Sequence, residues 1–224
     1  MRQDFLQPVW TRLCIGVLAA SASACARDPV PCVSPVGPAD LAITEIRGKQ
    51  PADPHGAQWV EVCNPTARAW PLAGLVLAFL RLDGSSERTV LVRDRTLAVA
   101  PGACAVLGLF GGVAQPGPDV DLDAPEVPDG GSESGLPYAA YDFSDQWDLS
   151  SGLYDAAVLE LRACGVLVDR VVYRDLPDRG TWSLDGSLPP SADANDASER
   201  WCVDSSGADL GYPGTPGVRN RPCE

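Results

Sequence analysis

Short runs of strand-forming residues, each ended by a turn signal, fill most of this chain between residues 41 and 173. The turns are rich in Pro and Gly, which number 21 and 22 among the 224 residues, and Asp83-Gly84 is a strong hairpin signal. Strands of this length and spacing are typical of antiparallel β-sandwiches. Several runs are apolar on both faces, so alternation does not say which residues point inward. We predict no amphipathic helix after residue 40 and seven strands, at 41–46, 58–63, 75–82, 89–92, 103–107, 156–162 and 166–173.

The N-terminal residues have the order of a bacterial export signal. A short start with two arginines is followed by an apolar run, by small residues and then by Cys25. The apolar run is shorter than the about 20 residues that a membrane-spanning helix needs. We therefore predict a signal peptide over 1–24 and a lipid anchor on Cys25, which places the protein in the cell envelope, at the outer membrane or the cell surface. Ala22 departs from the Leu usual in a lipid-attachment signal, and ordinary secretory cleavage after Ala24 is the alternative.

The number of cysteines supports lipid attachment. The chain has eight cysteines, of which Cys14 leaves with the signal. A lipid on Cys25 then leaves an even number for disulfides, whereas ordinary cleavage leaves an odd number and one free thiol. The cysteines expected in disulfides are Cys32, Cys63, Cys104, Cys164, Cys202 and Cys223, and their count alone leaves the connectivity open.

The chain is acidic throughout. Its formal net charge is −13, and removal of residues 1–24, with two arginines and one aspartate, makes it −14. An acidic surface repels nucleic acid and anionic headgroups. We therefore expect no nucleic-acid partner, and contact with the membrane only through the lipid.

Composition also divides the exported part of the chain. Residues 25–39 are rich in Pro and predict an extended tether, and residues 40–224 form one domain. Within that domain, 115–135 is rich in Pro, Gly, Asp and Ser and predicts a flexible insertion. The tail after Pro189 has few strand formers, and we expect disulfides to pin this loop-rich segment.

The order of several short motifs resembles the lamin-tail domain family over about residues 40 to 220. The motifs are Leu41–Ile46, Trp59–Thr66, Trp70–Leu77, Leu97–Gly102, Leu149–Gly152, Val168–Tyr173 and Gly214–Asn220. The stretches Trp182–Asp185, Asn195-Asp196 and Trp201-Cys202 resemble secreted bacterial members, notably myxobacterial ones. The resemblance implies an immunoglobulin-like β-sandwich, and it does not imply an enzyme. In bacteria such domains often occur in surface proteins.

The resemblance also implies one disulfide. At positions 63 and 104 the family more often shows an aromatic residue, and two departures of the same kind imply a Cys63–Cys104 pair. Cys164–Cys202 and Cys32–Cys223 are then the pairs expected for the remaining cysteines.

Two glutamates and one histidine are the candidates for catalysis. Glu45 and Glu61 occupy neighbouring predicted strands, and paired carboxylates can hydrolyse glycosides. We instead expect both to face outward and to pair with arginines such as Arg47 or Arg81. His55 lies between two strands without a nucleophile elbow, and one histidine cannot build a typical zinc site with oxidised cysteines, so it is expected to be an exposed loop residue.

Asp119, Asp121 and Asp123 alternate like the start of a calcium-binding loop. The EF-hand pattern needs Gly at the sixth position and Glu at the twelfth. Ala124 and Gly130 stand there, so the motif fails. We expect no cofactor and no metal, with weak calcium binding by this candidate binding loop as the alternative.

Aromatic residues are the last candidates. Trp59, Trp182 and Trp201 are expected to fill the core or to cover a disulfide, with a sugar-binding surface as the alternative. Taken together, the sequence predicts a non-enzymatic, lipid-anchored envelope protein whose domain mediates structural or binding interactions with an envelope or extracellular protein or glycan. The alternatives are a carbohydrate-binding module and a polysaccharide hydrolase that uses Glu45 and Glu61.

Overall fold

The computed structural model describes residues 36–51, 57–110, 139–147, 151–206 and 214–224. Nearly all regular structure in these residues is β-strand, and the exception is one turn of 3-10 helix, η1, at Ser198–Arg200. No helix among the described residues is long and apolar enough to cross a bilayer. Several predictions lie outside the described residues: the signal peptide, Cys25, Cys32, His55, the 115–135 insertion and its Asp119, Asp121 and Asp123.

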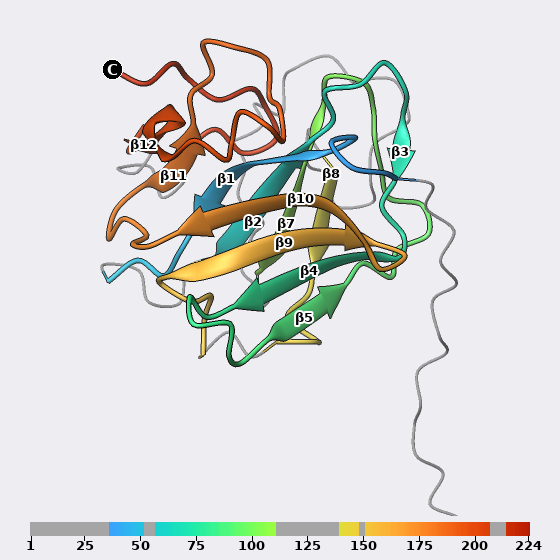
Figure 1. Ribbon diagram of the computed structural model, residues 1–224, viewed down its shortest axis with the longest axis horizontal. Helices are drawn as coiled ribbons and strands as arrows, with labels where there is room; N and C mark the ends of the chain where they lie inside the picture. Colours follow the sequence, from blue (N-terminus) through green and yellow to red (C-terminus); the bar gives the residue numbers. More distant parts are fainter. Residues whose placement is uncertain (1–35, 52–56, 111–138, 148–150, 207–213) are drawn as a thin grey trace, which may run out of the picture.

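Two sheets face each other and form a β-sandwich (Figure 1). One sheet has the order β12-β11-β1-β2-β7-β8, and the other has the order β10-β9-β4-β5. All pairs are antiparallel except β7–β8, which is parallel, and β3 and β6 pair separately. The strands are β1 (Ala42–Arg47), β2 (Gln58–Cys63), β3 (Trp70–Pro71), β4 (Leu75–Leu80), β5 (Arg88–Leu91), β6 (Ala98–Val99), β7 (Cys104–Leu109), β8 (Ala139–Asp142), β9 (Ala157–Ala163), β10 (Val166–Tyr173), β11 (Thr181–Leu184) and β12 (Trp201–Asp204).

The predicted all-β sandwich and its seven strands are confirmed. They correspond to β1, β2, β4, β5, β7, β9 and β10, with ends within two residues of the predicted ones. The strands that sequence reasoning missed are short and flanked by turn residues. Among them is β12, in the segment after Pro189 where no strand was expected, and it is stabilised by its antiparallel pairing with β11, which in turn pairs with β1.

The core lies between the two sheets. Val60 and Val62 of β2 and Leu77 and Phe79 of β4 belong to one continuous cluster of buried apolar residues there. Every residue of β1, β2 and β7 is buried, including those that point away from this core. The outer face of the six-stranded sheet is therefore covered as well, which explains why most residues of these strands are apolar on both faces in the sequence. The charged residues among them, Glu45, Arg47 and Glu61, are buried too.

A bulge in β1 sets which residues reach that outer face. The register runs from Ile43↔Val62 to Glu45↔Glu61, so Thr44 and Glu45 together lie opposite Glu61. An extra residue of this kind reverses the alternation of a strand. As a result Ile43 and Ile46 both enter the core, while Glu45 lies beside Glu61 on the outer face.

The predicted Cys63–Cys104 disulfide is confirmed. The two residues are directly opposite each other on β2 and β7, with their Cα atoms 4.0 Å apart. A pair this close is the type that lacks mutual backbone hydrogen bonds, in which side chains approach most closely.

The other two predicted pairings are wrong. Cys202 bonds to Cys223, with a Cα–Cα distance of 5.8 Å. The reason is the unpredicted β12, which holds Cys202 at the edge of the six-stranded sheet beside the tail, whereas Cys164 lies in the β9–β10 turn of the other sheet. Cys164 is also disulfide-bonded, and because the four cysteines above are already paired, its partner lies outside the described residues.

Candidate functional site

Residues 214–224, called the tail from here on, cover Glu45 and Glu61 on the outer face of the six-stranded sheet. Both glutamates have no exposed surface. Glu61 accepts hydrogen bonds from the Gly217 amide at 2.7 Å and from the Thr44 hydroxyl at 2.5 Å. Glu45 accepts one from the Thr215 amide at 3.2 Å. The pair therefore ties the tail to the sheet.

Two hydroxyl groups of β11 complete the surroundings of Glu45. Ser183 donates to its carboxyl at 2.8 Å, and Thr181 donates to the same oxygen. Burial raises the pKa of Glu45 to about 7, and burial together with the neighbouring Glu45 raises that of Glu61 well above its usual range. Both carboxyls are consequently protonated in mildly acidic solution.

Glu45 and Glu61 do lie on the outer face of the sheet, but they are buried there, and the prediction that they pair with arginines such as Arg47 or Arg81 is wrong. Arg47 is itself buried and donates to the Ala57 carbonyl, and the guanidinium of Arg81 lies 5.6 Å from the Tyr154 ring centroid. The tail is the reason that the glutamates have no arginine partners, because its backbone amides donate to them at a surface that would otherwise be open to water. It also closes the two carboxyls off from any polysaccharide.

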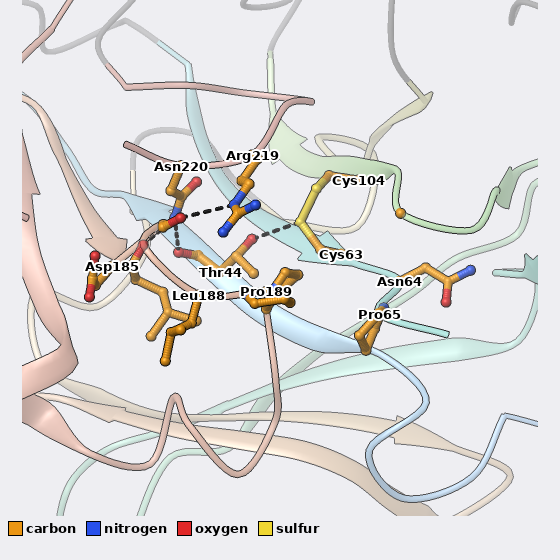
Figure 2. Close-up of a pocket in the computed structure, with 14 residues that line it drawn as sticks. Thr44, Cys63, Asn64, Pro65, Cys104, Asp185, Leu188, Pro189, Arg219 and Asn220 are labelled. Carbon is orange, nitrogen blue, oxygen red and sulfur yellow. Dashed lines mark hydrogen bonds between the residues drawn. A yellow bond between two sulfur atoms is a disulfide. The ribbon is translucent and has the colours of Figure 1, made fainter. Parts of the chain in front are cut away.

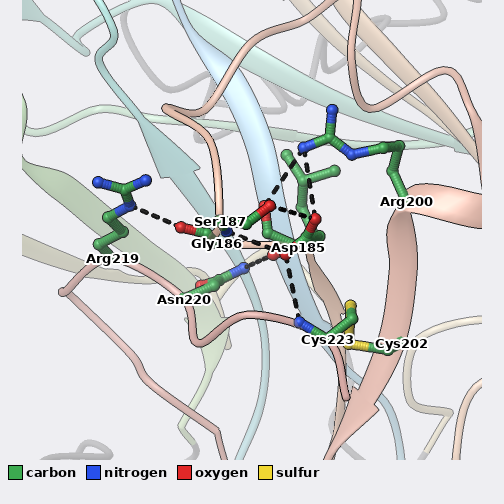
Figure 3. Close-up of polar contacts among 9 residues, drawn as sticks. Asp185, Gly186, Ser187, Arg200, Cys202, Arg219, Asn220 and Cys223 are labelled. Carbon is green, nitrogen blue, oxygen red and sulfur yellow. Dashed lines mark hydrogen bonds and ion pairs between the residues drawn. A yellow bond between two sulfur atoms is a disulfide. The ribbon is translucent and has the colours of Figure 1, made fainter.

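The turn after β11 clasps the same tail a few residues further on (Figure 3). The Gly186 amide donates to the Arg221 carbonyl at 3.0 Å, and the Cys223 amide donates to the Asp185 carboxylate at 3.2 Å. A Cβ atom on Gly186 would lie 1.8 Å from the Asn220 carbonyl oxygen. Only glycine permits the tail to approach this closely.

Asn220 joins the clasp to the sheet. Its amide nitrogen donates to the carbonyls of Thr44 at 2.7 Å and Leu184 at 2.9 Å. The Cys202–Cys223 disulfide then fixes the tail to β12. Backbone contacts, one buried amide and one covalent bond thus hold a segment that has no regular structure of its own.

A pocket of about 220 Å³ opens where the tail, the Asp185–Pro190 turn and the ends of β2 and β7 meet (Figure 2). The Cys63–Cys104 disulfide forms part of its lining, and Leu188, Pro189 and Pro65 supply apolar walls. The remaining lining residues are Thr44, Asn64, Gly102, Leu184, Asp185, Gly186, Pro190, Arg219 and Asn220.

This lining holds no pair of groups suited to nucleophilic or acid–base catalysis. Its carboxylate is Asp185, whose pKa is lowered by hydrogen bonds from the Ser187 side chain and amide. A carboxylate that is so readily ionised is a weak base at neutral pH. The geometry suits binding.

Glu61, Cys63 and Cys104 come closest to a metal site in the part of the chain that the structure describes, with their ligand atoms within 4.8 Å of one another. The two sulfurs are bonded to each other, however, and only thiolates are good ligands. The group is therefore a structural disulfide beside a buried carboxyl.

The three tryptophans do not form a sugar-binding platform. Trp59 is fully buried on the outer face with Val106 and Phe110. Trp182 and Trp201 stack on each other, with ring centroids 4.0 Å apart, and Trp201 is 7% exposed.

Sequence reasoning missed one further buried carboxyl. Asp169 of β10 accepts the Ile43 amide at 2.6 Å and the Asn195 side-chain amide at 2.7 Å. Burial raises its pKa to about 6. It links the two sheets to the loop between β11 and β12, and no motif marks it, because its partners come from β1 and from this loop far along the chain. The pocket residues were missed for the same reason.

A scan of protein-family models found no match to this chain, and neither the curated proteins nor the solved structures include a significant match.

Proposed function

We propose that this chain is a non-catalytic binding module of the bacterial cell envelope, with the pocket beside the Cys63–Cys104 disulfide as its binding site. The observation that supports the proposal is the pocket itself, which exists only because the tail is clasped against the sheet. Small concave sites with apolar walls and few polar groups are the usual form of a ligand site.

The burial of Glu45 and Glu61 favours a binding module over a glycosidase that uses these two residues. A glycosidase needs both carboxyls in contact with its substrate and with water. Glu45 and Glu61 have no exposed surface, and their oxygens are occupied by the tail and by hydroxyl groups. If Glu61→Gln abolished hydrolysis of an envelope polysaccharide in a protein that stayed folded, the proposal would be wrong.

The envelope location rests on the signal that ends at Cys25. We expect the protein to incorporate a fatty-acid probe and to partition into detergent, and we expect Cys25→Ser to release it from membranes. An unlabelled wild-type protein, together with a variant that stays membrane-bound, would contradict the lipid anchor.

The pocket is tested by a paired substitution of exposed leucines. Leu188 is 55% exposed at the pocket, and Leu82 is 43% exposed after β4, away from it. We expect Leu188→Asp to abolish cross-linking of the purified protein to isolated envelope, and Leu82→Asp to leave it unchanged, with equal thermal stability. Equal cross-linking by both variants would show that the pocket is not the binding site.

A further inference from the structure

We propose that the pocket captures the C-terminal carboxylate of a polypeptide that ends in an apolar residue, and that Arg219 pairs with this carboxylate. The inference rests on the proposed function, because it specifies the ligand of the same pocket.

Arg219 is held in place before any ligand arrives. Its Nε donates to the Gly186 carbonyl at 2.9 Å. Figure 2 shows its guanidinium between Asn220 and the Cys63–Cys104 disulfide. Among the described residues its two terminal nitrogens have no partner. The two terminal nitrogens are therefore available as a pair of donors at the end of the guanidinium, an arrangement that matches the two oxygens of a carboxylate.

The other polar side chains of the pocket are already engaged. Thr44 donates to Glu61, and Asn220 donates to two carbonyls. The Asn64 amide donates to two carbonyls of its own, those of Arg68 and Val99. Arg219 is thus the polar group of the lining that is available to a ligand.

Asp185 is the one negative charge of the lining. Its carboxylate accepts the Ser187 hydroxyl at 2.5 Å and the Cys223 amide, and it lies 3.8 Å from the Arg200 guanidinium. Donors and a cation thus surround this carboxylate, and they offset its repulsion of an incoming anion.

The walls and the size of the pocket define the rest of the ligand. Leu188, Pro189, Pro65 and the disulfide are apolar, and Leu188 is more than half exposed without a ligand. A volume of about 220 Å³ equals that of about seven water molecules. This is smaller than the roughly 300–1,000 Å³ of sites for larger small molecules. It suits one terminal residue, with its side chain against the walls and its carboxylate on Arg219.

Because the chain is acidic, binding of a carboxylate depends on its direct contact with the Arg219 guanidinium. A net charge of −13 repels anions at a distance. Recognition therefore depends on direct contact with Arg219, and not on general attraction.

The probe is a fluorescein-labelled peptide that ends in Gly-Ser-Val-Leu, with either a free carboxylate or a C-terminal amide. We expect fluorescence anisotropy with the full lipidated chain in detergent to show binding of the acid form. The amide form should bind at least tenfold more weakly, since a charge-assisted pair is lost. Arg219→Gln should weaken the acid form by the same factor and leave the amide form unchanged. Arg174→Gln is the matched control, because that exposed arginine follows β10 and does not line the pocket, and the variant should bind as the wild type does.

Equal binding of the acid and amide peptides, or an Arg219→Gln variant with unchanged affinity, would overturn the inference. Octanoate that displaces the peptide at equal concentration would also overturn it, because the ligand would then be any small apolar acid. Envelope cross-linking that is lost in Leu188→Asp while no peptide binds would leave the proposed function standing and refute only the ligand.

Discussion

Glu45 makes the docking of the tail depend on pH. Its carboxyl is completely buried, and it accepts hydrogen bonds from Ser183 and from the Thr215 amide. Burial raises its pKa from 4.5 to about 7. Glu45→Gln keeps the shape and one acceptor oxygen but cannot ionise, so it isolates the effect of this charge.

The raised pKa of Glu45 sets the direction in which the stability of the folded state changes with pH. The folded state binds the Glu45 proton more tightly than the unfolded state does, so this stabilisation is fully present below pH 4.5 and is lost as pH rises through about 7. A shift from 4.5 to about 7 corresponds to about 3 kcal/mol, at about 1.4 kcal/mol for each pKa unit. Glu45→Gln also removes the charge that helps to raise the pKa of Glu61. The stability that Glu61 loses as pH rises is therefore smaller in the variant, which adds to the difference from the wild type in the same direction.

The assay is urea unfolding with the disulfides oxidised, followed by tryptophan fluorescence at about pH 5 and about pH 8. We expect the free energy of unfolding of Glu45→Gln, relative to that of the wild type, to rise by about 3 kcal/mol between these two values. The comparison across pH cancels any constant cost of placing an amide in this site. A relative free energy that stays constant, or that falls toward higher pH, would show that Glu45 is not held protonated and would refute the reasoning.

Three further variants test the parts that hold the site. Replacing Cys63 and Cys104 by serine should lower the free energy of unfolding by about 4 kcal/mol in a urea titration, because the bond closes a loop of 41 residues' separation; a loss below about 1 kcal/mol would contradict this. Asp169→Ala should cost about 2–4 kcal/mol in the same assay, since it leaves buried donors without an acceptor, whereas a neutral effect would mean that water replaces the carboxylate. Gly186→Ala should expose the tail to limited proteolysis, because a Cβ would lie 1.8 Å from the Asn220 carbonyl oxygen, and a tail as resistant as that of the wild type would show that the clasp adjusts.

The positions of seven of the strands are local information, and the sequence by itself determined them, whereas β12 depends on its pairing with β11 and was missed. Runs such as Gln58–Cys63 and Val166–Tyr173 are bounded by turn residues, so their ends coincide with those of β2 and β10. The Cys63–Cys104 bond could be anticipated as well, through the resemblance to the lamin-tail family, although that resemblance stays a prediction. Each of these features depends on a few neighbouring residues or on one pair of positions.

The tertiary structure alone decided what Glu45 and Glu61 do. The sequence placed them on neighbouring strands, but their burial depends on Thr215 and Gly217, which are 170 and 156 residues away along the chain. The tail has no periodic pattern, because amide groups, one glycine and a disulfide hold it instead of an apolar stripe. Contacts of this kind leave no periodic signal in the sequence. The pocket and the orientation of Arg219 exist only where the tail meets the sheet, so only the folded chain could reveal them.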